Sequence, residues 1–139
     1  CRLESKVPNA AGSTTDWTAN TGTALAAVQD TLGGYDSDTD YISSSTSSQD
    51  HLFTFDFTAS GLASILFAYG QALTRNDGSG TINLLCKSGA TTTSKAPAPS
   101  TLTTSYKWKH AAFEVDPNTA AAWASLTDLE AAEFGVRYN

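Results

Sequence analysis

The 139-residue chain lacks methionine, has only two cysteines and carries few charged side chains. Charged residues make up 16% of the sequence, and the net charge is −6. The densest basic stretch is Lys107 and Lys109 on either side of Trp108, whereas nucleic-acid binding needs a concentrated basic surface that displaces counterions. No apolar run approaches the length that crosses a bilayer. We therefore expect neither a nucleic-acid partner nor a membrane-spanning segment.

Two cysteines are too few for a disulfide framework. Cys86 falls on the apolar side of an expected strand, which predicts a small buried hydrophobic residue. The chain begins with Cys1, and we favour a removed initiator Met, or a sequence that starts late, over a processed precursor or a lipid-carrying N-terminus. A Cys1–Cys86 bridge, or a bridge through Cys1 between two subunits, has no support in the sequence.

Serine and threonine are abundant, and the chain is long enough for one domain with its own core. This composition is typical of a rigid, turn-rich β protein rather than a helical one. We interpret residues 1–139 as a single domain.

The densest apolar content lies in residues 51–88. Phe residues alternate with polar ones over 51–57, which is the period of a half-buried strand. Further alternations predict a long strand over 62–75 and another that starts at Ile82. Asn, Asp and Gly residues in 76–80 are typical of a hairpin turn. The sequence therefore predicts three antiparallel strands, with a hairpin between the second and third.

The long strand has one bulky and one small face. The bulky face consists of Ile65, Phe67, Tyr69 and Leu73, and the small face of Leu66, Ala68, Gly70 and Ala72. A strand of this kind is usually central and closely approached on both sides. We expect the second neighbour to be another sheet or another subunit.

Other strands are expected at 2–7, 41–45, 106–115 and 136–138, with a short helical turn at 24–29. Pro8 to Gly12 should end the first strand, and Trp17 should anchor a loop onto the core. The apolar phase of 106–115 changes midway, which predicts a β-bulge near Lys109 and His110. Residues 91–100 contain two prolines and are interpreted as a surface loop.

One helix is expected, over 125–132. Ser125 can cap its N-terminus, and Asp128 and Glu130 suit the positive end of the helix. Seven or eight strands with one short helix near the C-terminus predict an all-β fold: a two-sheet antiparallel β-sandwich of jelly-roll type.

Three aspartates in the first third of the chain, Asp36, Asp38 and Asp40, are spaced like calcium ligands. An EF-hand loop needs Gly at its sixth position and Glu at its twelfth, where this chain has Tyr41 and Ser47. We interpret the stretch as a solvated turn.

No arrangement of residues indicates catalysis. His51 and His110 lie in no nucleophile or zinc signature, and we interpret each as a strand-edge or loop histidine. Asp56 and Glu114 should face solvent by alternation. Residues 78–80 lack the Lys and the helix of a phosphate-binding loop. The sequence predicts no enzyme and no catalytic, cofactor-binding or metal-binding residues.

Sugar binding is the harder function to set aside, because jelly rolls often carry exposed aromatic side chains that stack on sugars. The candidates by position are Trp17, Tyr35, Tyr41 and Trp108. We favour packing roles for them, because aromatic residues on strands usually face inward.

Several motifs follow one another along nearly the whole chain. They are Pro8-Asn9-Ala10-Ala11-Gly12, Thr14-Thr15-Asp16-Trp17-Thr18, Asp38-Thr39-Asp40-Tyr41-Ile42-Ser43-Ser44-Ser45-Thr46, Leu102-Thr103-Thr104-Ser105-Tyr106, Phe113-Glu114-Val115-Asp116-Pro117-Asn118-Thr119 with Trp123, and Glu133-Phe134-Gly135-Val136. In order and spacing they resemble a group of small, poorly characterised virion proteins of tailed bacteriophages. Residues 24–33 depart from the group's pattern, since they are less acidic and poor in proline.

The resemblance implies a structural role on the virion: a capsid decoration (cement) protein, a neck or collar part, or a fibre-associated subunit. It implies other copies of the chain and other virion proteins as partners, and it transfers no catalytic residues. A carbohydrate- or receptor-binding module is the alternative, with a glycan as partner. A lipoprotein or secreted hydrolase is a distant third.

Overall fold

The structure, a computed structural model, describes residues 4–29, 38–58, 64–76 and 79–139. Cys1 and the start of the predicted first strand lie outside these residues. The described part of that strand, residues 4–7, is not a strand. Instead, β1 begins at Ala10, within the stretch expected to end it.

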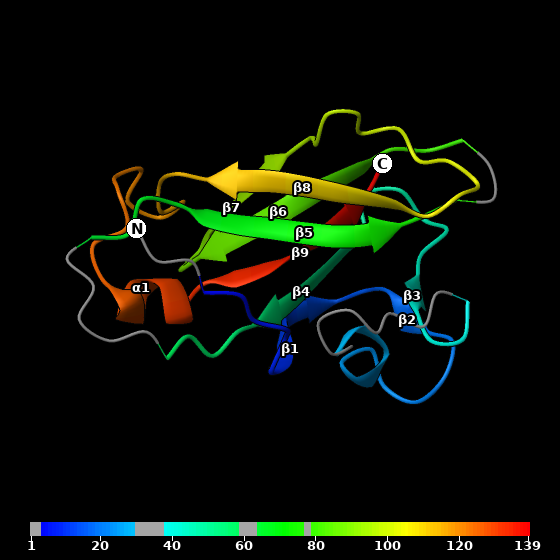
Figure 1. The fold of residues 1–139 in the computed structure, drawn as a ribbon, viewed down its shortest axis with the longest axis horizontal. Coiled ribbons are helices and arrows are strands. Elements are labelled where there is room, and N and C mark those ends of the chain that lie inside the picture. Colours follow the sequence, from blue (N-terminus) through cyan, green and yellow to red (C-terminus); the bar gives the residue numbers. More distant parts are fainter. Residues whose placement is uncertain (1–3, 30–37, 59–63, 77–78) are drawn as a thin grey trace.

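Five antiparallel strands form the main sheet, in the order β1-β4-β9-β6-β7 (Figure 1). Their bounds are Ala10–Thr15 (β1), Asp50–Thr54 (β4), Glu133–Tyr138 (β9), Ile82–Ser88 (β6) and Thr91–Lys95 (β7). Two further pairs are β5 (Ala68–Thr74) with β8 (Lys107–Phe113), and β2 (Thr18–Ala19) with β3 (Ile42–Ser43). The helical elements are η1 (Ala26–Val28) and α1 (Leu126–Glu130).

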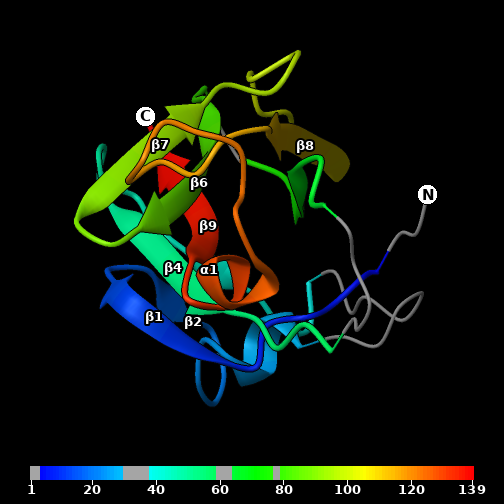
Figure 2. The ribbon, with the colours of Figure 1, turned by 90° about the vertical axis from the view of Figure 1, so that its left-hand side faces the viewer.

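The β5–β8 pair, called the ribbon below, lies over one face of the main sheet (Figure 2). Helix α1 lies at the end of the sandwich that faces the viewer in that figure. The predicted all-β, antiparallel sandwich with one short helix near the C-terminus is confirmed. Ser125 caps α1 as expected, because its hydroxyl accepts a hydrogen bond from the Asp128 amide at 3.2 Å.

The core lies between the ribbon and the main sheet. Phe113 of the ribbon meets Phe134 of β9 edge to face, with ring centroids 5.9 Å apart. The Trp123 indole nitrogen donates to the Phe113 carbonyl at 3.0 Å. The buried cluster also contains Ala68, Leu84, Cys86, Leu129 and Ala132. The core is thus built largely from aromatic side chains of β8, β9 and the segment before α1.

The predicted hairpin between the second and third strands is wrong. Strand β5 pairs with β8, whereas β6 pairs with β7 and β9, so the chain changes layer between β5 and β6. Turn-forming residues allow a sharp connection but do not determine which strands pair. The loop predicted over 91–100 is also wrong in part, since Thr91–Lys95 is β7. Gly89, with a φ of +55°, forms the turn that joins it to β6.

The predicted β-bulge in the strand 106–115 is wrong as well. The ribbon register runs without a shift from Ala68 opposite Phe113 to Thr74 opposite Lys107. No change of phase is needed, because Lys109 and not Trp108 faces inward. The Lys109 ammonium is buried and donates to the carbonyls of Pro99 at 2.7 Å and Thr101 at 2.9 Å. These bonds tie the loop before β8 to the ribbon.

The remaining predicted elements are found with shifted ends. Strand β3 is shorter than the expected 41–45, and β4 begins one residue early and ends at Thr54. The described residues 64–67 precede β5 without strand pairing. The final strand is longer than expected and lies between β4 and β6, in the middle of the main sheet.

Candidate interaction surface

The two faces of the ribbon are inverted relative to an ordinary sandwich layer. The small side chains of β5 face the core, and a Cβ added to Gly70 would lie 3.6 Å from the Phe113 ring. Ala68 is buried, whereas Tyr69 is 50% exposed. Because the large rings of Phe113, Phe134 and Trp123 already fill the core, β5 can contribute only small residues to it. Its bulky residues are therefore directed outward.

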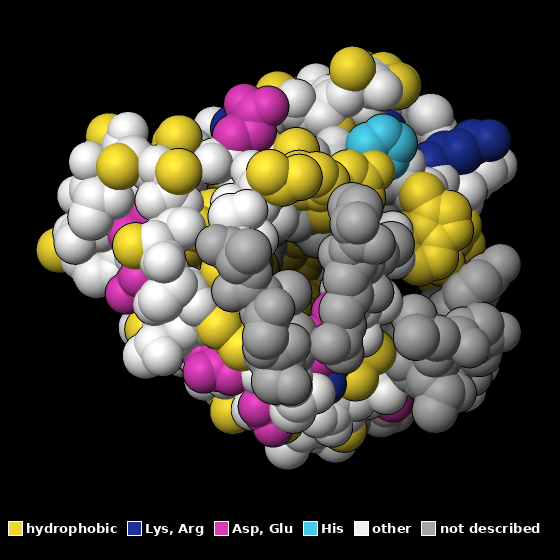
Figure 3. All heavy atoms as spheres, turned by 60° about the vertical axis from the view of Figure 1, so that its left-hand side comes forward, with side chains coloured by type: hydrophobic (Ala, Val, Ile, Leu, Met, Phe, Trp, Pro, Cys, Tyr) yellow, Lys and Arg dark blue, Asp and Glu magenta, His cyan; other side chains and the backbone are white. Residues whose placement is uncertain are grey.

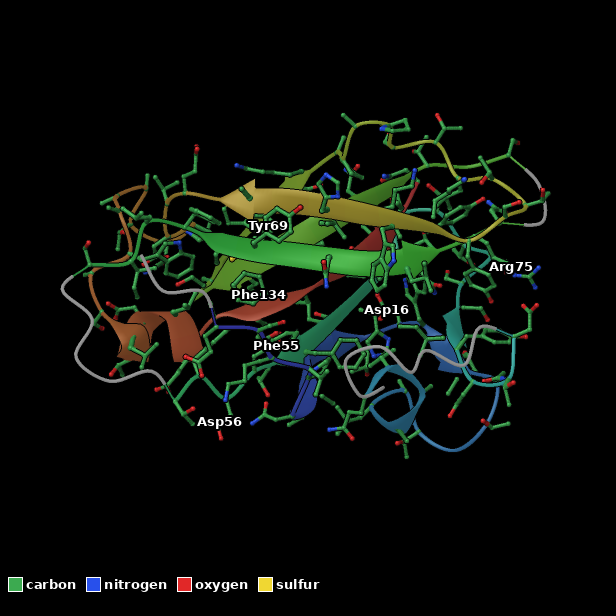
Figure 4. The ribbon with its side chains drawn as sticks, in the orientation of Figure 1. Asp16, Phe55, Asp56, Tyr69, Arg75 and Phe134 are labelled. Carbon is green, nitrogen blue, oxygen red and sulfur yellow. The ribbon has the colours of Figure 1, made fainter. Side chains whose placement is uncertain are left out.

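The outer side of the ribbon is called the aromatic face below. The strand register places Tyr69 opposite Ala112, Gln71 opposite His110 and Leu73 opposite Trp108, and Phe67 precedes this set. Figure 4 shows Tyr69 on the ribbon, whereas Phe134 of β9 and Phe55, just after β4, lie behind it.

Ring contacts order the aromatic face. The Tyr69 ring stacks on His110 with centroids 5.7 Å apart and planes 22° from parallel. Phe67 meets Tyr69 edge to face at 6.5 Å. The exposed fractions are 51% for Trp108, 46% for Phe67 and 68% for the neighbouring Leu66. Together with Tyr69 these side chains present roughly 400 Å², since a fully exposed aromatic presents about 150–250 Å². Patches of this size on a monomer are often functional.

Charged side chains lie at both ends of strand β8. Exposed Lys107 begins β8, and exposed Glu114 follows its last residue. Figure 3 shows this side of the molecule as a row of hydrophobic side chains, with an acidic group at one end and a histidine and basic groups at the other. By strand alternation Glu114 shares the outward side of β8 with Trp108 and His110, whereas Lys107 shares the side of the inward-facing Lys109.

The basic end is ordered by a small cluster. Arg75, just after β5, pairs with Asp38 at 2.8 Å and lies over the Tyr106 ring, 5.4 Å from its centroid. The Tyr106 hydroxyl donates to the Asp38 carboxylate at 2.9 Å. Desolvation by burial, together with this carboxylate, raises the pKa of Tyr106. The cluster ties the 38–40 turn to the ribbon.

A second candidate site is a cleft of about 410 Å³ beside the β1–β2 turn. It is lined by Asp16, Thr18, Ser43, Ser44, Ser45, Thr46 and Gln49. Several of these polar groups already satisfy one another, since the Ser44 hydroxyl bonds to the Gln49 side chain at 2.5 Å and Asp16 accepts from the Asp50 amide. The cleft is polar and lacks an aromatic wall.

The prediction for His51 is wrong. It is fully buried within β4, between β1 and β9, rather than at a strand edge or in a loop. Its Nδ1 accepts a hydrogen bond from the Trp17 amide at 3.2 Å, its Nε2 has no hydrogen-bond partner among the described residues, and its ring centroid lies 4.7 Å from that of Phe53. Burial lowers the pKa of His51, and the charge of Asp16 opposes that shift. Buried in this way, His51 fastens the turn that carries Trp17.

His110 and the other residues singled out in the sequence lie apart from His51. His110 is in the middle of β8 and exposed on the aromatic face. Asp56 and Glu114 are exposed, as predicted. Cys86 is fully buried, as predicted, and burial raises the pKa of its thiol to about 12, so the thiol is unreactive at neutral pH.

Sequence reasoning missed Asp116, which is buried. Burial alone would raise its pKa, but hydrogen bonds from Ser88, Asn118 and Thr119 outweigh that effect and hold the pKa below its usual value. The Asn118 amide donates to it at 2.8 Å. The Asp-Pro-Asn turn chemistry could have indicated this role in ordering the turn.

Two of the three aspartates spaced like calcium ligands, which we interpreted as part of a solvated turn, lie in the described residues. Asp36 lies outside the described residues, Asp38 pairs with Arg75, and Asp40 accepts from the Thr21 hydroxyl at 2.9 Å. Within the described ranges, no group of three His, Cys, Asp or Glu residues could hold a metal ion. No described helix is long and apolar enough to span a membrane.

The three aromatic candidates for sugar stacking that the structure describes are not brought together. Tyr35 lies outside the described residues, and half-buried Trp17 donates from its indole to the Gln49 carbonyl at 3.0 Å, as expected of a loop anchor. Tyr41 is 38% exposed beside β3. Of the three described candidates, Trp108 alone lies on the aromatic face, opposite Leu73 and beside His110. The alternation around Tyr69 was visible in the sequence, but not its outward direction.

Comparison with known proteins found no family model, no curated protein and no solved structure that matches this chain.

Proposed function

We propose that the chain is a non-enzymatic structural subunit of a tailed-phage particle, such as a capsid decoration protein or a neck, collar or fibre-associated subunit. The observation that carries the proposal is the aromatic face, where three large rings stand half exposed on a two-stranded layer. The motifs that resemble phage virion proteins in order and spacing support the same assignment.

Three large rings remain about half exposed on the isolated chain. Burial of a large apolar side chain is worth about 1.5–3 kcal/mol, and this fold leaves half of that area in water at Phe67, Tyr69 and Trp108. A contact surface recovers this free energy when a partner covers it. On a particle, one modest contact is multiplied by copy number and becomes strong in sum.

The buried ionisable groups that the structure describes serve the fold. Lys109 holds a loop, Asp116 holds a turn, and His51 holds the Trp17 segment. The polar cleft beside Asp16 is likewise largely satisfied within itself. Because these polar and ionisable groups are used within the fold, a structural subunit with an interaction surface is favoured over an enzyme.

The test is to find the chain on particles. Lysates of the source strain are fractionated on a density gradient, and an antibody against the chain is used to probe fractions and to label particles in electron micrographs. We expect the chain to sediment with tailed particles and to label one position on them. A chain that stays at the top of the gradient, in a lysate rich in particles, contradicts the proposal.

A glycan-binding module is the second candidate, and one observation favours it. Trp108 and Tyr69 flank the polar side chains of Gln71 and His110 on an open face, so that ring stacking and hydrogen bonding are offered together. A glycan array probed with the purified chain tests this function. Binding that is lost in Trp108→Ala and kept in the half-buried Trp17→Phe would establish it.

A further inference from the structure

Four hydrogen bonds fasten the turn between β1 and β2 to the start of β4. Three of them end on oxygen atoms. The Asp16 amide donates to the Asp50 carbonyl at 3.0 Å, and the Asp50 amide donates to the Asp16 carboxylate at 3.2 Å. The Trp17 indole donates to the Gln49 carbonyl at 3.0 Å. The fourth ends on a nitrogen, Nδ1 of His51, which accepts from the Trp17 amide at 3.2 Å. An imidazole nitrogen accepts a hydrogen bond only while it carries no proton, so this bond alone requires a neutral side chain.

The surroundings of His51 leave a charged ring without hydrogen-bond acceptors. The side chain is fully buried, with Thr15 opposite it on β1 and Val136 opposite it on β9. Because Nδ1 is the acceptor, the neutral ring carries its proton on Nε2, and that atom has no hydrogen-bond partner among the described residues. A protonated ring would therefore direct one N–H group at the amide of Trp17, which is itself a donor, and the other at no acceptor.

One charged group acts on this imidazole. Burial disfavours the protonated ring, and the carboxylate of Asp16 favours it. Asp50 is next to His51 in β4 but faces the other side of the strand, where its carboxylate pairs with Arg137 at 2.6 Å. No other described charge contributes to the pKa of His51, the inward-facing Lys109 of the ribbon included. The carboxylate that favours protonation thus belongs to the same turn that the neutral ring holds.

The elements beyond this turn are small. Strands β2 and β3 have two residues each and pair only with each other among the described strands. The Asn20 amide extends the pair with a bond to the Tyr41 carbonyl at 3.0 Å. Segments with few buried contacts open at a lower free energy than the whole fold. The turn and the β2–β3 pair can therefore separate from the main sheet without unpairing β4 from β9.

We propose that protonation of His51 releases the β1–β2 turn, together with the β2–β3 pair, from the main sheet while the five strands of that sheet stay paired. In the open state both ring nitrogens reach water, and the half-buried indole of Trp17 becomes exposed. This acid response goes beyond the proposed function and does not depend on it.

The direction of the response follows from linkage. Burial lowers the pKa of His51 in the closed state below the ordinary 6.5, which the open state regains. The open state therefore binds a proton more readily. As the pH falls below 6.5, the ratio of open to closed molecules rises by up to about tenfold per pH unit, until the pH reaches the closed-state pKa.

The experiment follows the ¹⁵N-labelled chain by NMR from pH 7.5 to pH 4. The bond between the Trp17 amide and Nδ1 of His51 is detected as a nitrogen–nitrogen coupling across the hydrogen bond, and the imidazole ¹⁵N shifts report protonation. Hydrogen-exchange protection factors are compared between the amides of Asp16, Trp17 and Asn20 and those of β6 and β9. As His51 gains its proton, we expect the coupling to vanish and protection at the three amides to fall roughly tenfold relative to the main sheet.

Three variants assign the response. His51→Gln keeps an oxygen that can accept from the Trp17 amide but does not titrate, and it should remove the pH dependence. His110→Gln, the matched change at the exposed histidine of the ribbon, should keep it. Asp16→Asn removes the charge that favours protonation but keeps an oxygen for the Asp50 amide, so the response should move to lower pH.

Two kinds of result overturn the proposal. The first is a coupling that persists when the ring is protonated, or a ring that is still neutral at pH 4. The second is an equal loss of protection in the turn and in β6 and β9, since acid would then unfold the chain as a whole. If the buried His51→Gln variant does not fold, the coupling and the imidazole shifts of the parent chain decide alone. Sedimentation with particles, which tests the proposed function, is unaffected by either result.

Discussion

The main sheet and the ribbon use their residues in opposite ways. In the main sheet, the central strand is so closely enclosed that a Cβ added to Gly135 would lie 1.8 Å from the His51 carbonyl oxygen. In the ribbon, a Cβ added to Gly70 would meet only the Phe113 ring, at 3.6 Å, and large side chains point into solvent. The sheet is built to be complete within one chain, whereas the ribbon leaves one side available to a partner.

The largest effect expected from this comparison is at the two glycines. Gly135→Ala should cost more than about 4 kcal/mol, because the new methyl group would overlap β4 backbone atoms that cannot move without breaking the sheet. Gly70→Ala should change stability by less than about 1 kcal/mol and can raise it, because the strand loses less entropy on folding. Urea unfolding of both variants measures the difference. Equal losses would mean that the two layers are equally tight.

The next largest effect should be the difference in stability between variants on the two sides of the ribbon. Phe113→Ala removes a buried ring and should cost about 3–5 kcal/mol. Tyr69→Ala should cost less than about 1 kcal/mol in the monomer, because half of the ring is already in water. Thermal melts at low protein concentration provide the measurement. A Tyr69→Ala variant as unstable as Phe113→Ala would show that the outer ring belongs to the core.

Two lysines on the same side of β8 separate the effect of burial from that of charge, because Lys109 is buried and Lys107 is exposed. Lys109→Met leaves the Pro99 and Thr101 carbonyls without their donor and should cost about 1–3 kcal/mol. Lys107→Met should stay within about 0.5 kcal/mol of the parent, because Lys107 is exposed at the strand end. Chemical denaturation decides between them. A Lys109→Met variant as stable as the parent would mean that water satisfies the two carbonyls as well as the ammonium does.

The smallest effect concerns the two histidines. Burial lowers the folded-state pKa of His51 below its ordinary 6.5, so the unfolded chain binds a proton more readily than the folded chain. Stability is therefore complete above pH 6.5 and falls as the pH drops below that value. Unfolding at pH 7.5 and 5.5 should show this loss in the parent and in His110→Gln but not in His51→Gln. Loss of the pH effect in His110→Gln would assign it to the ribbon instead.

The sequence predicted much of the fold through local signals. Alternation at Phe53 and near Ile82 placed β4 and β6, and the Ser125 cap placed α1. Long-range pairing was not predictable, because nothing local joins β5 to β8 or inserts β9 between β4 and β6. Alternation also reports that two faces differ but not which one is inside. Trp108 was assigned a packing role because aromatic residues on strands usually face inward, and the rings of Phe113, Phe134 and Trp123 occupy the space that it would need.

The position of β9 has a consequence for folding during synthesis. Strands β4 and β6 share no hydrogen bonds with each other and are joined only through Glu133–Tyr138. Until β9 is synthesised, the β1–β4 and β6–β7 pairs therefore remain separate, and each has an unpaired strand edge. A nonsense codon between residues 96 and 132 would therefore leave the β1–β4 and β6–β7 pairs without the strand that joins them into one sheet.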